Sequence, residues 1–137
     1  MEEILEMIKI INKTYEECYL EYKPAHLYEK AKDNFTNGYC YEYSIILKRF
    51  YYDGLIVMQN DKMHSAILIN NTIYDVNGIR YDTNNFHVAN GTDFEYIYKY
   101  YGFMSTAFKD YLNKKIVKQV FNTNNQYVKK RKNLVKI

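Results

Sequence analysis

The chain has 137 residues, of which 47% are hydrophobic, and its net charge at pH 7 is only +3. This length suits one compact domain, residues 1–137, with a real core, and no run approaches the roughly 20 apolar residues of a membrane span. The acidic first residues also lack the basic start of a signal peptide. We therefore expect a cytoplasmic protein that makes no membrane contact and keeps its two cysteines, Cys18 and Cys40, as free thiols.

Helices are expected in the first part of the chain. Residues 2–21 have apolar side chains at helical spacing and a polar opposite face, with Cys18 on the apolar side. Pro24 ends this helix or starts a second one over 24–35, because proline is tolerated in the first turn. After a turn at "TNGY", residues 40–52 predict a helix that begins at Cys40.

A meander of short strands is expected next. The strands are predicted at 55–59, about 63–69 and 72–77, with turns at "ND" and "NN" between them. Residues 79–90 indicate another short strand followed by a loop.

Two more helices are expected towards the end of the chain. Gly91 introduces the first, with Thr92 and Glu95 as its capping box and Gly102 at its end. Its tyrosines, with Phe103, favour a core stripe, and a last helix spans about 105–121. Helices, then strands, then helices is an α+β order.

Cys40 is the first candidate for chemistry, because it lies in the first turn of its helix. The unpaired N–H groups and partial positive charge of a helix N-terminus stabilise a thiolate. Gly38 allows a tight turn and a close approach of substrate. The Cys40 N–H would point towards an oxyanion that forms at the atom under attack.

The following hairpin offers a base for this thiol. With a two-residue turn at 70–71, His64 and Asp75 share a face of the sheet, because alternate side chains point the same way. His64 then lies directly across from Asn77 and diagonally from Asp75. A carboxylate or amide beside an imidazole fixes its tautomer and stabilises the imidazolium. A shift of one residue at the turn would move Asp75 to the other face.

These segments resemble a family of thiol enzymes. "NGYCYEYS" at 37–44 resembles the Gly-x-Cys-aromatic segment of papain-like hydrolases. "HSAILINNTIYDVNG" at 64–78 is more similar to the His-strand-hairpin-Asp core of transglutaminase-like and NlpC/P60-like members. The resemblance covers about 34–79, a little over a third of the chain. It implies a papain-like core, with N-terminal helices and the cysteine helix packed on a small antiparallel sheet, followed by C-terminal helices.

The resemblance also implies roles for particular residues. Carried over by position, Cys40 is the nucleophile, His64 the base and Asp75 the orienting group, and no metal or cofactor is required. Papain-type members supply a side-chain amide to the oxyanion hole, usually a glutamine before the cysteine, and none is present here. Asn34 and Asn37 are the possible replacements, with Asn77 as a further orienting candidate. The chain is short for a papain-type protease. This favours a compact peptidase, amidase or acyl transferase that acts on a peptide or another amide, ester or thioester.

Each residue of the triad also has a structural explanation. Cys40 can be a small buried hydrophobe, His64 a satisfied strand histidine, and Asp75 a turn former. All three in this order favour the triad over chance. His26 or His87 is the substitute base if the register of the hairpin differs. A metal site that joins Cys18, Cys40 and His26 fits no zinc spacing and is less favoured.

The basic last part of the chain supports a rival function. Residues 105–137 form a C-terminal helical segment, and nine Lys/Arg stand against Asp110 alone within 109–137. Such clusters neutralise phosphates or pair with acidic partners, although a solvated face is the commoner explanation. The alternative is therefore an inactive papain-like scaffold that binds protein or nucleic acid through Lys129, Lys130, Arg131 and Lys132.

Overall fold

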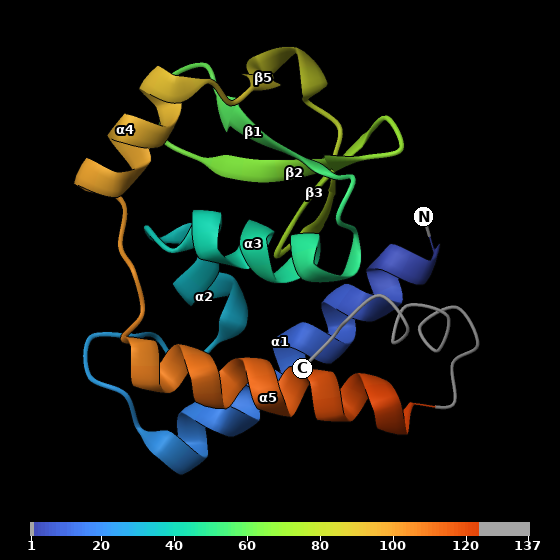
Figure 1. The fold of residues 1–137 in the computed structure, drawn as a ribbon, viewed down its shortest axis with the longest axis vertical. Coiled ribbons are helices and arrows are strands. Elements are labelled where there is room, and N and C mark those ends of the chain that lie inside the picture. Colours follow the sequence, from blue (N-terminus) through green and yellow to red (C-terminus); the bar gives the residue numbers. More distant parts are fainter. Residues whose placement is uncertain (1, 124–137) are drawn as a thin grey trace.

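The computed structural model describes residues 2–123 and has the expected α+β order (Figure 1). The helices are α1 (Glu2–Tyr22), α2 (Ala31–Thr36), α3 (Cys40–Phe50), α4 (Gly91–Tyr100) and α5 (Thr106–Asn122). The strands are β1 (Leu55–Gln59), β2 (Ser65–Ile69), β3 (Thr72–Asp75), β4 (Gly78–Arg80) and β5 (Phe86–Val88), with a 3-10 turn, η1 (Thr83–Asn85), before β5. None of the helices within residues 2–123 has the length and hydropathy to cross a bilayer.

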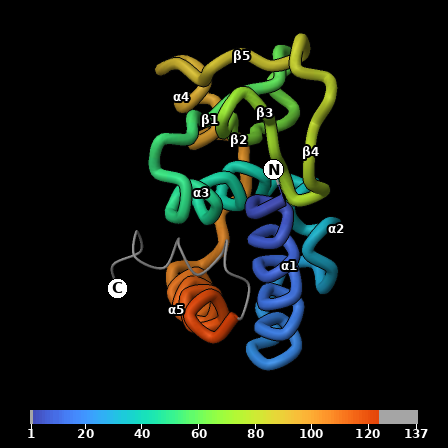
Figure 2. The backbone as a smooth tube through the Cα atoms, turned by 90° about the vertical axis from the view of Figure 1, so that its right-hand side faces the viewer, coloured from blue at the N-terminus to red at the C-terminus, as the bar shows by residue number. Residues whose placement is uncertain are grey.

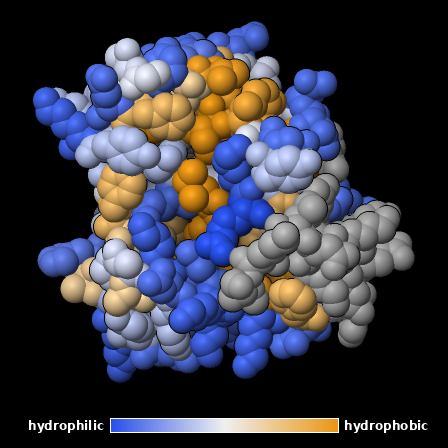
Figure 3. Space-filling model, in the orientation of Figure 1, coloured by the Kyte–Doolittle hydropathy of each residue, from blue (hydrophilic) through white to orange (hydrophobic). Residues whose placement is uncertain are grey.

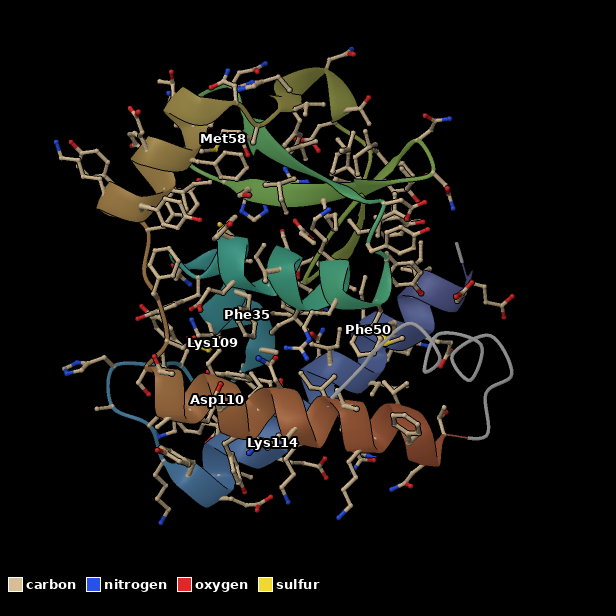
Figure 4. The ribbon with its side chains drawn as sticks, in the orientation of Figure 1. Phe35, Phe50, Met58, Lys109, Asp110 and Lys114 are labelled. Atoms are coloured by element: carbon tan, nitrogen blue, oxygen red, sulfur yellow. The ribbon has the colours of Figure 1, made fainter. Side chains whose placement is uncertain are left out.

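Helix α3 is the centre of the molecule. Figures 1 and 2 show it between the sheet on one side and α1 and α5 on the other. Eight of its eleven residues are buried, because side chains on almost every side of α3 face another element. Figure 4 shows Phe35 and Phe50 in the space between α3 and the α1–α5 layer. The N-terminus of a central helix is therefore held rigidly from several directions.

The sheet is antiparallel, with the strand order β4-β3-β2-β1-β5. The two-residue turn between β2 and β3 is confirmed, because Ile69 pairs with Thr72. Asn70 and Asn71 both adopt positive φ, 49° and 66°, which is the backbone of a type I′ hairpin turn. Asparagine tolerates this conformation better than most residues, so the "NN" pair fixes the register on which the site depends.

The prediction of a helix over 24–35 is wrong for its first half. Only Ala31–Thr36 is helical, and the chain before it turns through Lys23 and His26, whose φ angles are 52° and 67°. Positive φ cannot continue a right-handed helix. Pro24 therefore lies in a turn between α1 and α2.

The second half of the sheet differs from the expectation in two respects. Gly78 begins β4 instead of ending a strand, and β5 adds a further strand beside β1, with His87 opposite Met58. The predicted strand and loop over 79–90 thus hold the end of one edge strand and all of the other. Short edge strands carry a weak sequence pattern, since three residues show only one alternation.

The capping box of helix α4 lies two residues earlier than predicted. The box is formed by Asn90 and Asp93, each side chain bonding the other's backbone N–H, and Thr92 and Glu95 have no part in it. Asparagine caps at least as well as threonine. The predicted core stripe of α4 is wrong for two of its three residues. Tyr100 and Phe103 are exposed, whereas Tyr96 is half-buried against the cluster that contains Ile97, the buried apolar residue of this helix.

Candidate functional site

Cys40 is the first residue of α3 and is only 3% exposed. The chain reaches it through Gly38, whose φ is 103°, a conformation that glycine adopts without strain. The backbone N–H of Ser65, at the start of β2, donates to the Cys40 Sγ at 3.4 Å. Figure 1 shows that α3 and β2 begin on the same side of the molecule. The thiol therefore lies where a helix N-terminus meets the first residue of a central strand.

His64 and Asp75 form a buried pair at this end of the hairpin. The Nε2 of His64 lies 2.9 Å from the Oδ2 of Asp75. The other carboxylate oxygen, Oδ1, accepts from the N–H of Asn77 at 2.8 Å. Arg80 Nη1 donates to Oδ2 at 3.2 Å. With Nε2 engaged by the carboxylate, the Nδ1 of His64 is the ring nitrogen left for the Cys40 thiol.

The charges of the pair follow from these contacts. Burial disfavours the imidazolium of His64, but hydrogen bonds to Asp75 and to the Cys40 thiol outweigh burial and raise its pKa from 6.5 to about 9. Burial also opposes the charge on Asp75. Hydrogen bonds from His64, the Asn77 N–H and Arg80 nevertheless hold the pKa of this carboxyl below its ordinary value. At neutral pH the thiol thus faces a cationic imidazole.

The structure brings Cys40, His64 and Asp75 together. The alternation of side chains along the hairpin did not indicate on which side of the sheet they would meet. The side chains of the sheet that pack towards α3 are the alternate set, which includes Ile67 and Tyr74. Ala66, which has the same parity as His64, belongs to a separate cluster on the other face. His64 precedes the first residue of β2 and Asp75 is the last residue of β3. The pair therefore meets the thiol at the end of the hairpin and not across its helix-covered face.

The three candidate amides have other contacts. Buried Asn34 accepts from the Tyr28 N–H at 3.2 Å through its Oδ1, while its Nδ2 is buried and has no partner within residues 2–123. Exposed Asn37 donates to the Asp33 carbonyl at 2.6 Å. Asn77 contributes its backbone N–H to Asp75, so His64 is oriented by Asp75 itself. The oxyanion role of these side chains stays a prediction that none of these bonds supports.

Two residues near the triad were missed in the sequence. Arg80 bonds both Asp75 and Asp82, and its guanidinium lies 5.4 Å from the ring centre of Phe86. The segment "RYD" at 80–82 was a signal for it. Arg80 ends the edge strand β4, and in extended chain a residue and the second one after it point to the same side. Tyr101 is the second, and it follows the exposed end of α4 with no distinguishing pattern in its sequence.

The other histidines do not serve the thiol. His87 bonds Asn60 through Nδ1 and Asp93 through Nε2, both at 2.7 Å, and so acts as a link between the strand loop and α4. His26 lies exposed in the turn before α2. Within residues 2–123, no three His, Cys, Asp or Glu side chains are grouped as metal ligands. Cys18 is buried on α1, as expected.

A cavity of about 280 Å³ lies on the neighbouring side of α3. Its walls include Tyr41, Tyr98 and Phe103, and the buried Glu42, which pairs with Lys109 at 2.9 Å, lies at its base. Figure 3 shows a hollow on the face of the molecule, where apolar side chains lie between polar ones. Tyr41, which lines this cavity, directly follows Cys40 in the sequence. The basic residues Lys129–Lys132 lie outside the described part of the chain.

The comparison with protein families gives a match over most of the chain. The model of the family described as Phage YunG-like protein matches residues 21–121, a stretch that contains Cys40, His64 and Asp75. No curated protein and no solved structure gives a significant match. The match covers well over half of the chain, which therefore belongs to the Phage YunG-like family.

Proposed function

We propose that this protein is a thiol-dependent hydrolase or acyl transferase that attacks an amide, ester or thioester carbonyl. Cys40 is the nucleophile, His64 moves the proton, and Asp75 orients His64. The observation that carries the proposal is the arrangement around the thiol, where Ser65 N–H contacts Sγ at 3.4 Å and His64 is paired with Asp75 at 2.9 Å. The order Cys, His, Asp along the chain adds the likeness to papain-like and NlpC/P60-like hydrolases.

The reaction follows from the charges at the site. A cationic His64 beside Cys40 supplies the positive charge that a thiol nucleophile pairs with. The sulfur adds to the carbonyl carbon, and the electron pair of the C=O bond moves to oxygen. When the tetrahedral intermediate collapses, the bond to the leaving group breaks and His64 gives that group its proton. Water or an amine, deprotonated by His64, then attacks the thioester and releases Cys40.

Asp75 has a defined part in this cycle. Its Oδ2 accepts from His64 and from Arg80, and its Oδ1 accepts from Asn77 N–H. Three donors hold the carboxylate in place and keep it ionised, so it fixes the ring of His64 and offsets the charge of the imidazolium. A thiol that must stay reduced also fits a cytoplasmic location, and both cysteines of the chain are free.

The proposal is tested with an acyl donor that needs no natural substrate. A small thioester such as S-phenyl thioacetate should acetylate Cys40 in the wild type and release thiophenol in a burst equal to the protein concentration. Mass spectrometry of the peptide that contains Cys40 locates the acetyl group. The matched control is Cys18→Ala, which should keep the burst, whereas Cys40→Ala should lose it. Acetylation of both cysteines at the same slow rate would contradict the proposal.

The basic segment remains the alternative. Binding of nucleic acid at 129–132 would give complexes with duplex or single-stranded oligonucleotides that weaken steeply with salt. A gel-shift titration at two salt concentrations measures this directly, and Lys129→Glu with Lys130→Glu should abolish such a shift.

A further inference from the structure

Tyr101, in the connection between α4 and α5, extends its side chain towards the end of the sheet where the thiol lies. The hydroxyl of Tyr101 lies 3.4 Å from the Sδ of Met58 and donates to the carbonyl of Lys62 at 2.9 Å. Met58 is the residue opposite Ser65 in the β1–β2 register. Ser65 in turn contacts the Cys40 Sγ. These contacts bring the Tyr101 hydroxyl to the end of the strands where the thiol lies.

The backbone around Tyr101 is held against the start of α3. Gly102 N–H donates to the carbonyl of Gly38 at 2.8 Å. A side chain at Gly102 would meet the ring of Tyr39 at 2.8 Å, so only glycine allows the two loops to pack this closely. Tyr101 is thus fixed at its backbone by the loop that leads into Cys40, and at its hydroxyl by the loop that leads into His64.

The electrostatics of Tyr101 agree with this position. Burial raises the pKa of its phenol, and the negative charge of a Cys40 thiolate, the next largest cause, raises it further. The hydroxyl is therefore protonated throughout the ordinary pH range and has a hydrogen-bond proton to offer. Among the residues that contact the thiol, it adds a neutral donor to the cationic His64.

We propose that Tyr101 is a catalytic residue of the same site and donates its hydroxyl hydrogen bond to the oxyanion of the tetrahedral intermediate. This inference rests on the proposed function of Cys40. In the resting site the O–H bonds the Lys62 carbonyl. When sulfur adds to the carbonyl carbon, negative charge appears on an oxygen one bond from that carbon, and the O–H turns to it. The Cys40 N–H, free of a helical partner at the first position of α3, is the second donor.

The arrangement also explains the chain's lack of a glutamine before Cys40. Asn37 bonds the Asp33 carbonyl, and Asn34 is held on the Tyr28 N–H through its Oδ1, with its Nδ2 buried and without a partner within residues 2–123. A donor from the α4–α5 connection takes the place of an upstream amide. The oxyanion site thereby depends on two segments more than 60 residues apart in the chain. A phenol donates one strong, rigid hydrogen bond at little cost in side-chain entropy, because tyrosine has few rotatable bonds.

The experiment compares two reagents on one thiol. Iodoacetamide alkylates a thiolate by displacement, with no oxyanion, whereas N-acetylglycinal forms a hemithioacetal whose oxygen needs a donor. The dissociation constant of the aldehyde adduct is obtained from the protection of Cys40 against iodoacetamide. Alkylation of Cys40 is measured by mass spectrometry across a range of pH. Tyr101→Phe removes only the hydroxyl. Tyr100→Phe, at an exposed neighbour in the same helix end, is the matched control.

For Tyr101→Phe we expect aldehyde protection at least tenfold weaker than in the wild type, on the scale of one oxyanion donor. The alkylation rate at its high-pH plateau should change less than threefold, and Tyr100→Phe should match the wild type in both. Unchanged aldehyde protection in Tyr101→Phe overturns the inference. An equal loss of aldehyde protection and of alkylation rate also overturns it, because it would indicate that Tyr101 only packs against the site. A tenfold faster alkylation overturns it too, because it would indicate that Tyr101 only shields the thiol from solvent. If wild-type Cys40 reacts no faster than Cys18, the nucleophile assignment fails as well.

Discussion

Two histidine–aspartate pairs lie within residues 2–123, and only one of these two lies beside a thiol. His64 and Asp75 are joined at 2.9 Å, and His87 and Asp93 at 2.7 Å. The side chain of His64 is 11% exposed and that of His87 is 38% exposed. The second ring nitrogen of His87 is hydrogen-bonded to Asn60, whereas the second ring nitrogen of His64 is left for Cys40.

The carboxylates differ in the same way. Asp75 is held by His64, Arg80 and a backbone N–H, all at the end of one hairpin. Asp93 caps α4 through the N–H of Asn90 and also pairs with Lys62 at 3.5 Å. The first carboxylate serves a reactive group and the second serves a helix end. A His–Asp pair is thus no sign of chemistry unless the second nitrogen of the imidazole faces a nucleophile.

The largest expected effect separates the two carboxylates by reactivity. Asp75→Asn should slow the acetylation of Cys40 by a thioester about a hundredfold, because the imidazole loses the group that fixes its tautomer. Asp93→Asn should leave the rate within about twofold. Stopped-flow release of thiophenol measures both. Equal slowing in the two variants would show that the pairs act alike and would contradict the assignment.

The second effect is a pH dependence of stability from the raised pKa of His64. A group whose pKa is 6.5 unfolded and about 9 folded stabilises the fold fully below pH 6.5, and this contribution is lost as the pH rises through 9. The difference in unfolding free energy between wild type and His64→Gln should therefore fall by about 3 kcal/mol from pH 6 to pH 9.5. Urea unfolding at the two pH values measures it. The comparison is repeated with Cys40→Ala in both chains to separate the titration of the thiol, and a constant difference would contradict the pKa.

The third effect concerns the structural pair. Asp93→Ala removes the acceptor of the Asn90 N–H, of His87 and of Lys62, and should destabilise the protein by about 1–2 kcal/mol. The plateau rate of Cys40 alkylation should stay within about twofold of the wild type. Thermal unfolding and alkylation on the same sample measure both. A large loss of reactivity without a loss of stability would place the second pair in the site.

The smallest effect tests the support of Asp75. Arg80→Ala should lower the acetylation rate about fivefold, because one of three donors to the carboxylate is lost. Arg80→Lys keeps a charge there, though not the two-armed contact with Asp82, and should recover part of the rate. Lys48→Ala, a cationic residue bonded to carbonyls of the loop before β1, is the control and should have no effect. A rate unchanged in Arg80→Ala would remove this residue from the account.

The sequence was most informative where one local rule decides the structure. The Asn70-Asn71 turn alone set the β2–β3 register, and with it the meeting of His64 and Asp75. Apolar spacing was sufficient for α1, α3 and α5. Tertiary contacts decided the rest. Tyr101 reaches the site only because Gly102 packs on Tyr39, and β5 joins β1 from 27 residues away. No periodicity in the chain carries that information.

The same limit applies to the two faces of the hairpin. Alternation placed His64 and Asp75 on one face correctly, but it did not say which face α3 covers. The larger apolar residues Ile67 and Tyr74 of the opposite set attract the helix, because they bury more area. Cys40 then lies near His64, which precedes the first residue of β2 and so lies outside the strand.

The most direct test of the central claim is the rate of iodoacetamide alkylation of Cys40 relative to Cys18 in one sample at pH 7. Both thiols are buried, and burial together with Glu21 raises the pKa of Cys18 to about 11, so Cys18 is an internal reference. The account predicts that Cys40 reacts at least a hundredfold faster, that His64→Ala removes most of this difference, and that His87→Ala leaves it intact. Equal slow rates in the wild type, or a ratio that survives His64→Ala, would contradict it.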